Sequence, residues 1–186
     1  NALEAAGEGK VIFSYEESYG YMLGDYVRDK DAVTASMLLT EMAAWYAAQG
    51  MTLFDALNAL YEKYGYYAEK THNLVMPGLD GLRDMAELMR KLKDEPPTEI
   101  AGTEVVVRKD YNDGTVHDCR TGAVTKMELS GSNVLRFELA DGTTILARPS
   151  GTEPKIKVYI LARGKDAVDA AANVEKYGAW AEALKG

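Results

Sequence analysis

The chain has 186 residues, of which 29 are acidic and 21 basic, and its formal net charge at pH 7 is −8. This length predicts one domain or two small ones, and a content of 47% hydrophobic residues is enough to bury a core. No stretch approaches about 18 consecutive apolar residues, which excludes a membrane span. The negative charge argues against nucleic acid or a membrane surface as a partner. The single cysteine, Cys119, cannot form an internal disulfide, which fits a cytoplasmic protein.

Two further features concern the organisation of the chain. Residues 1–65 carry ten acidic and four basic side chains, whereas the remaining residues carry nineteen and seventeen. This shift in charge predicts a boundary near residue 65. The sequence begins with Asn1 rather than methionine, which we interpret as an expression remnant or an internal fragment of a longer protein.

The first part is predicted to contain a strand, a loop and two helices. The apolar run at residues 10–14 is typical of a short buried strand, and the Gly-, Tyr- and charge-rich residues 16–30 indicate a loop. Apolar residues at helical spacing follow over residues 32–49. A second helix is expected from Thr52, because Thr52 and Asp55 have the spacing of a capping box.

Residues 66–186 are predicted to form a separate α+β unit. Apolar and β-branched runs indicate strands at residues 66–76, 103–111, 135–139, 143–147 and 155–163. Asp141 and Gly142 form a typical two-residue turn between two of these strands. Apolar residues at helical spacing indicate helices at residues 79–93 and 166–184.

The segment from Arg148 to Lys157 carries the strongest chemical signal. Its sequence is Arg-Pro-Ser-Gly-Thr-Glu-Pro-Lys-Ile-Lys, and it lies between two predicted strands. Two prolines bracket its centre and stiffen the loop. Consecutive backbone N–H groups, two hydroxyls and one guanidinium form a donor set suited to phosphate, and they belong to Arg148, Ser150, Gly151 and Thr152.

The strand after this loop adds further positive charge. Period-two alternation puts Ile156, Val158 and Ile160 on one face, and Lys157 on the other with further polar residues. Four basic residues and one acidic residue lie between Arg148 and Arg163, although the chain as a whole is acidic. The alternative interpretation is a proline-rich hairpin loop next to a solvated strand face, because Ser, Gly, Thr and Pro are ordinary turn residues.

This string resembles the phosphate-binding loop in the C-terminal domain of the α-D-phosphohexomutases, which are the phosphoglucomutase and phosphomannomutase enzymes. A second string, Glu16-Glu17-Ser18-Tyr19-Gly20, is similar to the sugar-binding loop of their third domain. In that loop a Glu-x-Ser pair binds two adjacent ring hydroxyls, and the resemblance carries this role over to Glu16 and Ser18. The chemistry is suitable, because a carboxylate accepts from hydroxyls and a serine both donates and accepts.

A basic segment follows the sugar loop in phosphoglucomutases, and Arg28-Asp29-Lys30-Asp31 is similar to it. The resemblance implies that Lys30 reaches the substrate. The alternative is a charged loop in which Asp29 or Asp31 is the N-cap of the next helix. The chain departs from the family at Ser14-Tyr15 and at Ala32, where glycine is common before and after these loops.

The resemblance covers nearly the whole chain and implies its domains. Residues 1–65 would be the C-terminal part of the third domain, the strand-loop-helix-helix tail of an α/β domain. Residues 66–186 would be the fourth domain, an α+β fold with an antiparallel sheet packed by two helices, similar to the TATA-box-binding protein.

The implied function is that of a C-terminal fragment of a phosphoglucomutase-like isomerase. Such an enzyme interconverts sugar 1-phosphate and 6-phosphate through a phosphoserine and a bisphosphate. The expected partners are a sugar phosphate of the glucose 1-phosphate or 6-phosphate class and the missing N-terminal domains. The alternatives are a phosphopentomutase or phosphomannomutase of the same family, a stand-alone sugar-phosphate-binding module, and a structural domain whose loops are only turns.

We expect no catalytic residue and no metal site within this chain. The family's active serine follows a Thr-Ala dipeptide, but here Thr34-Ala35-Ser36 lies inside a helical pattern, so we interpret Ser36 as structural. The family's Asp-rich magnesium loop has no counterpart, so Mg²⁺ would be a cofactor of the parent enzyme, held outside this chain. His117 and Cys119 offer only two metal ligands, and we interpret them as surface loop residues.

Overall fold

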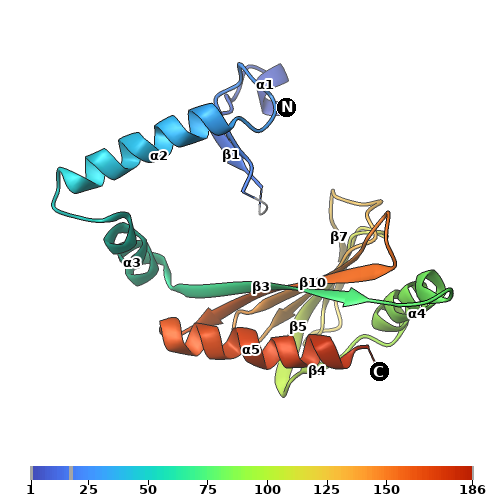
Figure 1. Ribbon diagram of the computed structural model, residues 1–186. Helices are drawn as coiled ribbons and strands as arrows, with labels where there is room; N and C mark the ends of the chain where they lie inside the picture. The colour runs from blue at the N-terminus through green and yellow to red at the C-terminus, as the bar shows by residue number, and fades with distance from the viewer. Residues whose placement is uncertain (1, 17–18, 186) are drawn as a thin grey trace. The chain divides into compact units, whose positions relative to one another are not determined.

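The computed structural model describes residues 2–16 and 19–185, and the chain divides into two compact units, Asn1–Leu60 and Tyr61–Gly186. Figure 1 shows the elements of each unit. Within the described residues, no helix combines the length and the apolar character needed to cross a bilayer.

The first unit contains a two-stranded hairpin and mostly helix. Strands β1 (Phe13–Tyr15) and β2 (Tyr21–Leu23) pair antiparallel, and they lie between α1 (Ala2–Ala5) and α2 (Ala32–Ala47). The predicted strand at residues 10–14 is confirmed in part, since β1 includes Phe13 and Ser14, but its predicted burial is wrong because all three residues of β1 are exposed. A two-stranded ribbon buries little side-chain surface by itself, which accounts for this exposure. The predicted loop at residues 16–30 contains β2.

Side-chain caps define where the two long helices of this region begin. The Asp31 carboxylate accepts hydrogen bonds from the Val33 and Thr34 N–H groups at the start of α2. Before α3 (Leu53–Tyr64), the Thr52 N–H donates to Asp55 Oδ2 at 2.8 Å, and the Asp55 N–H donates to Thr52 Oγ1 at 3.1 Å. This reciprocal pair confirms the predicted capping box.

The second unit is built on one antiparallel sheet. The strands lie in the order β3-β10-β9-β8-β5-β6-β7, and β4 pairs with β5 outside this path. Their bounds are β3 (Tyr66–Val75), β4 (Glu99–Ile100), β5 (Thr103–Asp110), β6 (Thr115–Asp118), β7 (Val124–Lys126), β8 (Leu135–Leu139), β9 (Thr144–Pro149) and β10 (Lys155–Gly164). The α+β prediction with an antiparallel sheet is confirmed. The interpretation of His117 as a loop residue is wrong, because it lies within β6 and is half-buried.

Two helices cover one face of this sheet and close the core. Figure 1 shows α5 (Ala167–Ala183) lying along β3 and β10, while α4 (Gly81–Asp94) packs near β9 and β10. On β10, Ile156, Val158 and Ile160 are fully buried, and Met89 of α4 and Val174 of α5 belong to the same core. The burial of apolar area on this face is the main stabilising contribution to the unit.

A tyrosine hydroxyl joins α5 to the hairpin turn of the sheet. Tyr177 is fully buried, and its hydroxyl donates to Asp141 and accepts from Thr103. Burial and the hydrogen bond to Asp141 raise the pKa of Tyr177 to about 12, so the phenol stays protonated and continues to donate.

A close contact between α5 and β3 needs a glycine at position 178. Gly178 is buried, and a Cβ atom built on it would lie 2.7 Å from Nε2 of His72. The other ring nitrogen of His72, Nδ1, lies 2.9 Å from Glu182 one turn further along α5. The glycine therefore lets the imidazole fit between strand and helix.

We expect Gly178→Ala to destabilise the unit by about 1–3 kcal/mol, because the added methyl group overpacks against His72. In a His72→Ala background the same change should become stabilising by about 0.5–1 kcal/mol, since alanine is the better helix former. Chemical denaturation of the four proteins of this double-mutant cycle measures both values. A destabilisation that persists at full size without His72 would contradict the assignment.

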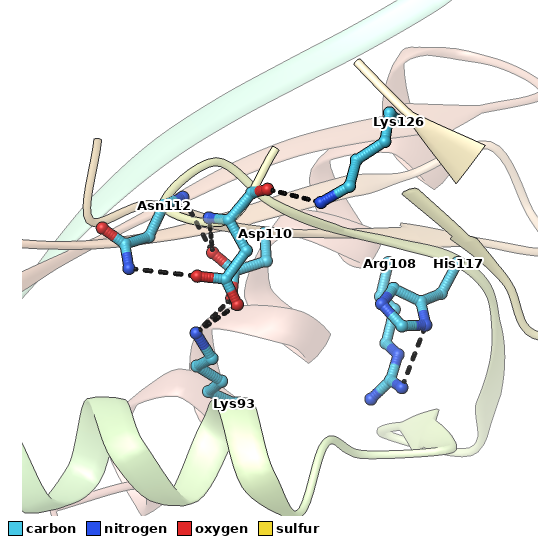
Figure 2. Close-up of polar contacts among 7 residues, drawn as sticks. Lys93, Arg108, Asp110, Asn112, His117 and Lys126 are labelled. Carbon is cyan, nitrogen blue, oxygen red and sulfur yellow. Dashed lines mark hydrogen bonds and ion pairs between the residues drawn. The ribbon is translucent and has the colours of Figure 1, made fainter. Parts of the chain in front are cut away.

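An ionic cluster fixes the end of α4 to the β5–β6 turn (Figure 2). Lys93 Nζ lies 2.9 Å from Asp110 Oδ2 and 2.7 Å from Asp113 Oδ2. Asp110 also accepts from the N–H groups of Asn112 and Asp113. Burial raises the pKa of Asp110, but the hydrogen bonds from Lys93 and the backbone outweigh it, so this pKa lies below its ordinary value.

Asp110→Asn should lower the free energy of unfolding by about 1 kcal/mol at pH 7, a modest value because Lys93 is partly exposed. A carboxylate with a lowered folded pKa stabilises above the unfolded pKa, near 3.9, and this contribution is lost as pH falls through the folded pKa. The difference between the two proteins should therefore shrink under acid. Denaturation curves from neutral pH to about pH 3 measure it, with the exposed Asp84→Asn as control. A constant difference over this range would contradict the expectation.

Candidate functional site

The β9–β10 hairpin builds the predicted phosphate loop. Lys157 on β10 lies directly opposite Arg148 on β9, and Ile156 lies opposite Pro149. The Ser150 N–H donates to the Lys155 carbonyl at 2.8 Å and closes the loop. The residue that follows β3 holds the loop in place as well, because the Met76 N–H donates to the Pro154 carbonyl at 2.8 Å.

The tip of this loop offers backbone donors to solvent. Gly151 and Thr152 are exposed, and a Cβ atom on Gly151 would meet nothing within 4 Å. The Thr152 N–H makes a long hydrogen bond to Ser150 Oγ at 3.4 Å, and no described residue accepts from the Gly151 N–H. Of the three predicted N–H donors, Ser150 is thus used within the hairpin, while Gly151 and Thr152 remain available to an anion.

Two uncompensated cations lie next to these donors. Arg148 and Lys157 are register partners, so both side chains lie on the sheet face opposite the helices. Among the described residues, neither has a carboxylate within ion-pair distance, because the nearby Glu153 pairs with Lys155 at 2.5 Å. Like charges directly opposite each other destabilise a sheet, and an anion bound between them would relieve this repulsion.

The predicted hydroxyl-binding loop is the β1–β2 hairpin of the first unit. The Glu16 N–H donates to the Gly20 carbonyl at 2.8 Å, and Lys30 Nζ lies 3.7 Å from Glu16 Oε1. A Cβ atom on Gly20 would lie 2.4 Å from Lys30 Cδ, so only glycine lets the lysine cross the hairpin. The structure therefore brings Glu16 and Lys30 together, while Ser18 lies outside the described residues.

A small polar cavity of about 180 Å³ lies beside this hairpin, and Glu16, Gly20 and Lys30 are among its lining residues. The hydrogen bond from Lys30 to Asp29, and then the charges of Asp29 and Glu16, raise the pKa of Lys30. Lys30 is thus a firmly protonated donor. Asp31 is the N-cap of α2, as the alternative interpretation of this segment proposed, and Lys30 still contacts Glu16.

The other candidates show no site chemistry. Ser36 lies in α2 and its hydroxyl donates to the Ala32 carbonyl at 2.7 Å, which supports a structural role. In the part of the chain that the structure describes, no three His, Cys, Asp or Glu side chains are placed to hold a metal ion. Sequence reasoning missed the need for glycine at position 20, because a lysine ten residues further along the chain causes it.

Comparisons with known proteins match both units of the chain to domains of one family. The family model described as "Phosphoglucomutase/phosphomannomutase, alpha/beta/alpha domain III" matches residues 1–64. The model described as "Phosphoglucomutase/phosphomannomutase, C-terminal domain" matches residues 73–175. The hairpin with Glu16 lies in the first match, and the loop from Arg148 to Lys157 lies in the second.

Individual relatives carry the name phosphoglucomutase. A phosphoglucomutase of Staphylococcus aureus (strain bovine RF122 / ET3-1) is 37% identical over 150 residues, which are 81% of this chain and 27% of that protein. A phosphoglucomutase of Staphylococcus haemolyticus is 37% identical over 149 residues, 80% of this chain and 27% of that protein. The chain thus spans little more than a quarter of the length of these relatives.

A solved structure shares the fold. The open form of the exocytosis-sensitive phosphoprotein pp63/parafusin, a phosphoglucomutase from Paramecium, matches with a TM-score of 0.60 and 19% identity. The match covers 98% of this chain and 31% of that one. Because family models match residues 1–64 and 73–175 and relatives exceed one-third identity, the chain belongs to the phosphoglucomutase/phosphomannomutase family.

Proposed function

We propose that this chain supplies the substrate-phosphate loop and the sugar-hydroxyl loop of a phosphoglucomutase-like enzyme. The observation that carries the proposal is that Arg148 and Lys157 lie opposite each other on one sheet face. Neither has a carboxylate partner among the described residues. The exposed Gly151 and Thr152 N–H groups lie next to them. The planar guanidinium of Arg148, the ammonium group of Lys157 and these two backbone N–H groups together suit a phosphate dianion.

The sugar part of the substrate would be recognised by the other hairpin. Glu16 accepts hydrogen bonds from ring hydroxyls, and Lys30 donates to a ring or phosphate oxygen. Ser18 is assigned to the same role by its place in the family motif. Each loop thus recognises one chemical part of a sugar phosphate, and this division suits an enzyme that must hold the sugar in two orientations.

The reaction is a phosphoryl transfer in two halves. A phosphoserine outside this chain gives its phosphoryl group to the free hydroxyl of a sugar monophosphate, and the other phosphate of the bisphosphate then returns to the serine. The residues of this chain bind and orient, which is the main task of a protein in phosphoryl transfer. We expect the 186-residue chain alone to show no mutase activity.

Magnesium belongs to the proposal only for the complete enzyme. Its ligands would lie outside this chain, because the family's Asp-rich loop has no counterpart in the sequence. Within the family, a phosphopentomutase or phosphomannomutase is the alternative, and a stand-alone sugar-phosphate-binding module is another. Ribose 5-phosphate and mannose 6-phosphate, tested beside glucose 6-phosphate, distinguish the first two.

Arg148→Gln should weaken binding of glucose 6-phosphate to the chain by about tenfold or more, since it removes a charge-assisted fork. The same change should stabilise the ligand-free chain by about 0.2–1 kcal/mol, because it removes the repulsion with Lys157. NMR titration, followed at the Gly151 and Thr152 amides, measures the binding, and denaturation measures the stability.

Arg163→Gln is the matched control, because Arg163 is an exposed arginine on β10 outside the loop. It should leave both the affinity and the amide shifts unchanged. If glucose 6-phosphate fails to shift the two amides at millimolar concentration, or if Arg148→Gln binds as well as the unchanged chain, the phosphate-loop assignment is wrong.

In a longer gene product that also carries the serine and magnesium loops, Arg148→Ala should lower kcat/KM for glucose 1-phosphate by about tenfold to a hundredfold. Steady-state kinetics measure this loss. An unchanged kcat/KM would contradict the proposal for the enzyme even if the isolated chain binds sugar phosphate.

A further inference from the structure

A groove separates the end of α4 from strands β5 and β6. It consists of two cavities of about 240 Å³ and 490 Å³, which share the lining residues Pro96, Arg108 and His117. The cavities lie in the second unit, on the side of the sheet that carries the core. The phosphate loop cations lie on the opposite face, so the groove is a separate feature.

Two polar residues shared by the cavities, Arg108 and His117, continue a buried row of the sheet. Phe137 pairs in register with Ile145 on one side and with Arg108 on the other, and Arg108 pairs with His117. Register partners share a face, so this row passes from buried apolar residues to a guanidinium and an imidazole. Leu92, Pro96 and Phe137 line the smaller cavity around them.

The contact between Arg108 and His117 determines which groups are offered to a ligand. Arg108 Nη2 lies 3.3 Å from His117 Nδ1, as Figure 2 shows. Arginine can only donate, so Nδ1 accepts and the ring proton lies on Nε2. Burial, and then the charge of Arg108, lower the pKa of His117, and the charge of Asp110 opposes this shift. The pair thus presents N–H donors and one positive charge.

The charges around the groove select the charge of its ligand. Lys93 is compensated by Asp110 and Asp113, and Lys109 by Glu138 at 2.8 Å. Among the residues that the structure describes, no carboxylate lies within ion-pair distance of Arg108. The smaller cavity is lined by three basic and three acidic side chains, namely Lys93, Arg108, Lys109, Asp94, Asp110 and Asp113. The larger cavity adds Asp118 and Glu104, and Glu104 pairs with Arg120. A monoanion can pair with Arg108, whereas the second charge of a dianion would find no uncompensated cation and would lie near these carboxylates.

We propose that this groove binds a small monocarboxylate with an apolar chain. The carboxylate accepts from the Arg108 fork and from His117 Nε2–H, and the apolar chain lies against Leu92, Pro96 and Phe137. A planar guanidinium matches a carboxylate in two parallel hydrogen bonds, and the apolar wall favours a hydrocarbon chain over a sugar.

The test is a titration of the 186-residue chain with hexanoate, followed by NMR of the Arg108 Nε–H and His117 ring signals. We expect saturable shifts, and contacts between the hexanoate chain protons and the Leu92 and Phe137 side chains. Hexanamide, which has the same chain without the charge, and inorganic phosphate should each bind about tenfold more weakly or worse. The contacts between hexanoate and these side chains are measured in the unchanged protein, so the test does not depend on whether a variant folds.

Arg108→Gln should weaken hexanoate binding by about tenfold or more, while Arg163→Gln, the same loss of charge outside the groove, should not. Arg148→Gln should also leave hexanoate binding unchanged, so the groove and the proposed phosphate loop fail or succeed independently. Binding that is not saturable, equal binding of hexanamide, or unchanged affinity of Arg108→Gln would each overturn the proposal. Tighter binding of phosphate than of hexanoate would overturn the assignment to a monocarboxylate.

Discussion

The period-two alternation of β10 is the constraint on which the second unit depends. This strand pairs with β3 over its ten residues and with β9 over six. Ile156, Val158 and Ile160 are fully buried under the helices, which leaves Lys155 and Lys157 no place except the other face. A register slip of one residue would carry two ammonium groups into the core, at a cost that no surface contact offsets. The core therefore determines where the cations of the proposed phosphate loop lie.

The same pairing places an electrostatic conflict at the loop. Arg148 and Lys157 lie opposite each other without compensation from a described carboxylate, while the hairpin bond between Ser150 and Lys155 holds them in register. A fold selected only for stability would place opposite charges there. Interactions that destabilise the fold locally are typical of functional positions. The buried residues of β10 offset the repulsion between Arg148 and Lys157.

The sequence was sufficient to predict elements whose pattern is long. β10, α2 and α5 show several periods of alternation or helical spacing, and the capping box before α3 depends only on neighbours in sequence. The strands β4, β6 and β7 have two to four residues each, too few to show a period, and sequence analysis missed them. The phosphate loop could be proposed from the sequence because its donor residues are contiguous. The environment of His117 could not be predicted, because it depends on Arg108 in the neighbouring strand. The register that brings these two residues opposite each other is not visible in the sequence.

The position of the groove follows from where α4 stops. The helix ends at Asp94, and the prolines at 96 and 97 prevent it from continuing over β5 and β6. Phe137, Arg108 and His117 lie side by side on neighbouring strands. Phe137 is buried in the core, whereas Arg108 and His117 line the groove. Apolar residues at these positions would have left an exposed hydrophobic strip beside the core. A guanidinium that donates to an imidazole satisfies one ring nitrogen and leaves the other groups as donors. The end of a helix and the register of the short strand β6 thus produce a half-apolar groove with one uncompensated guanidinium, on the face of the sheet opposite the proposed phosphate loop.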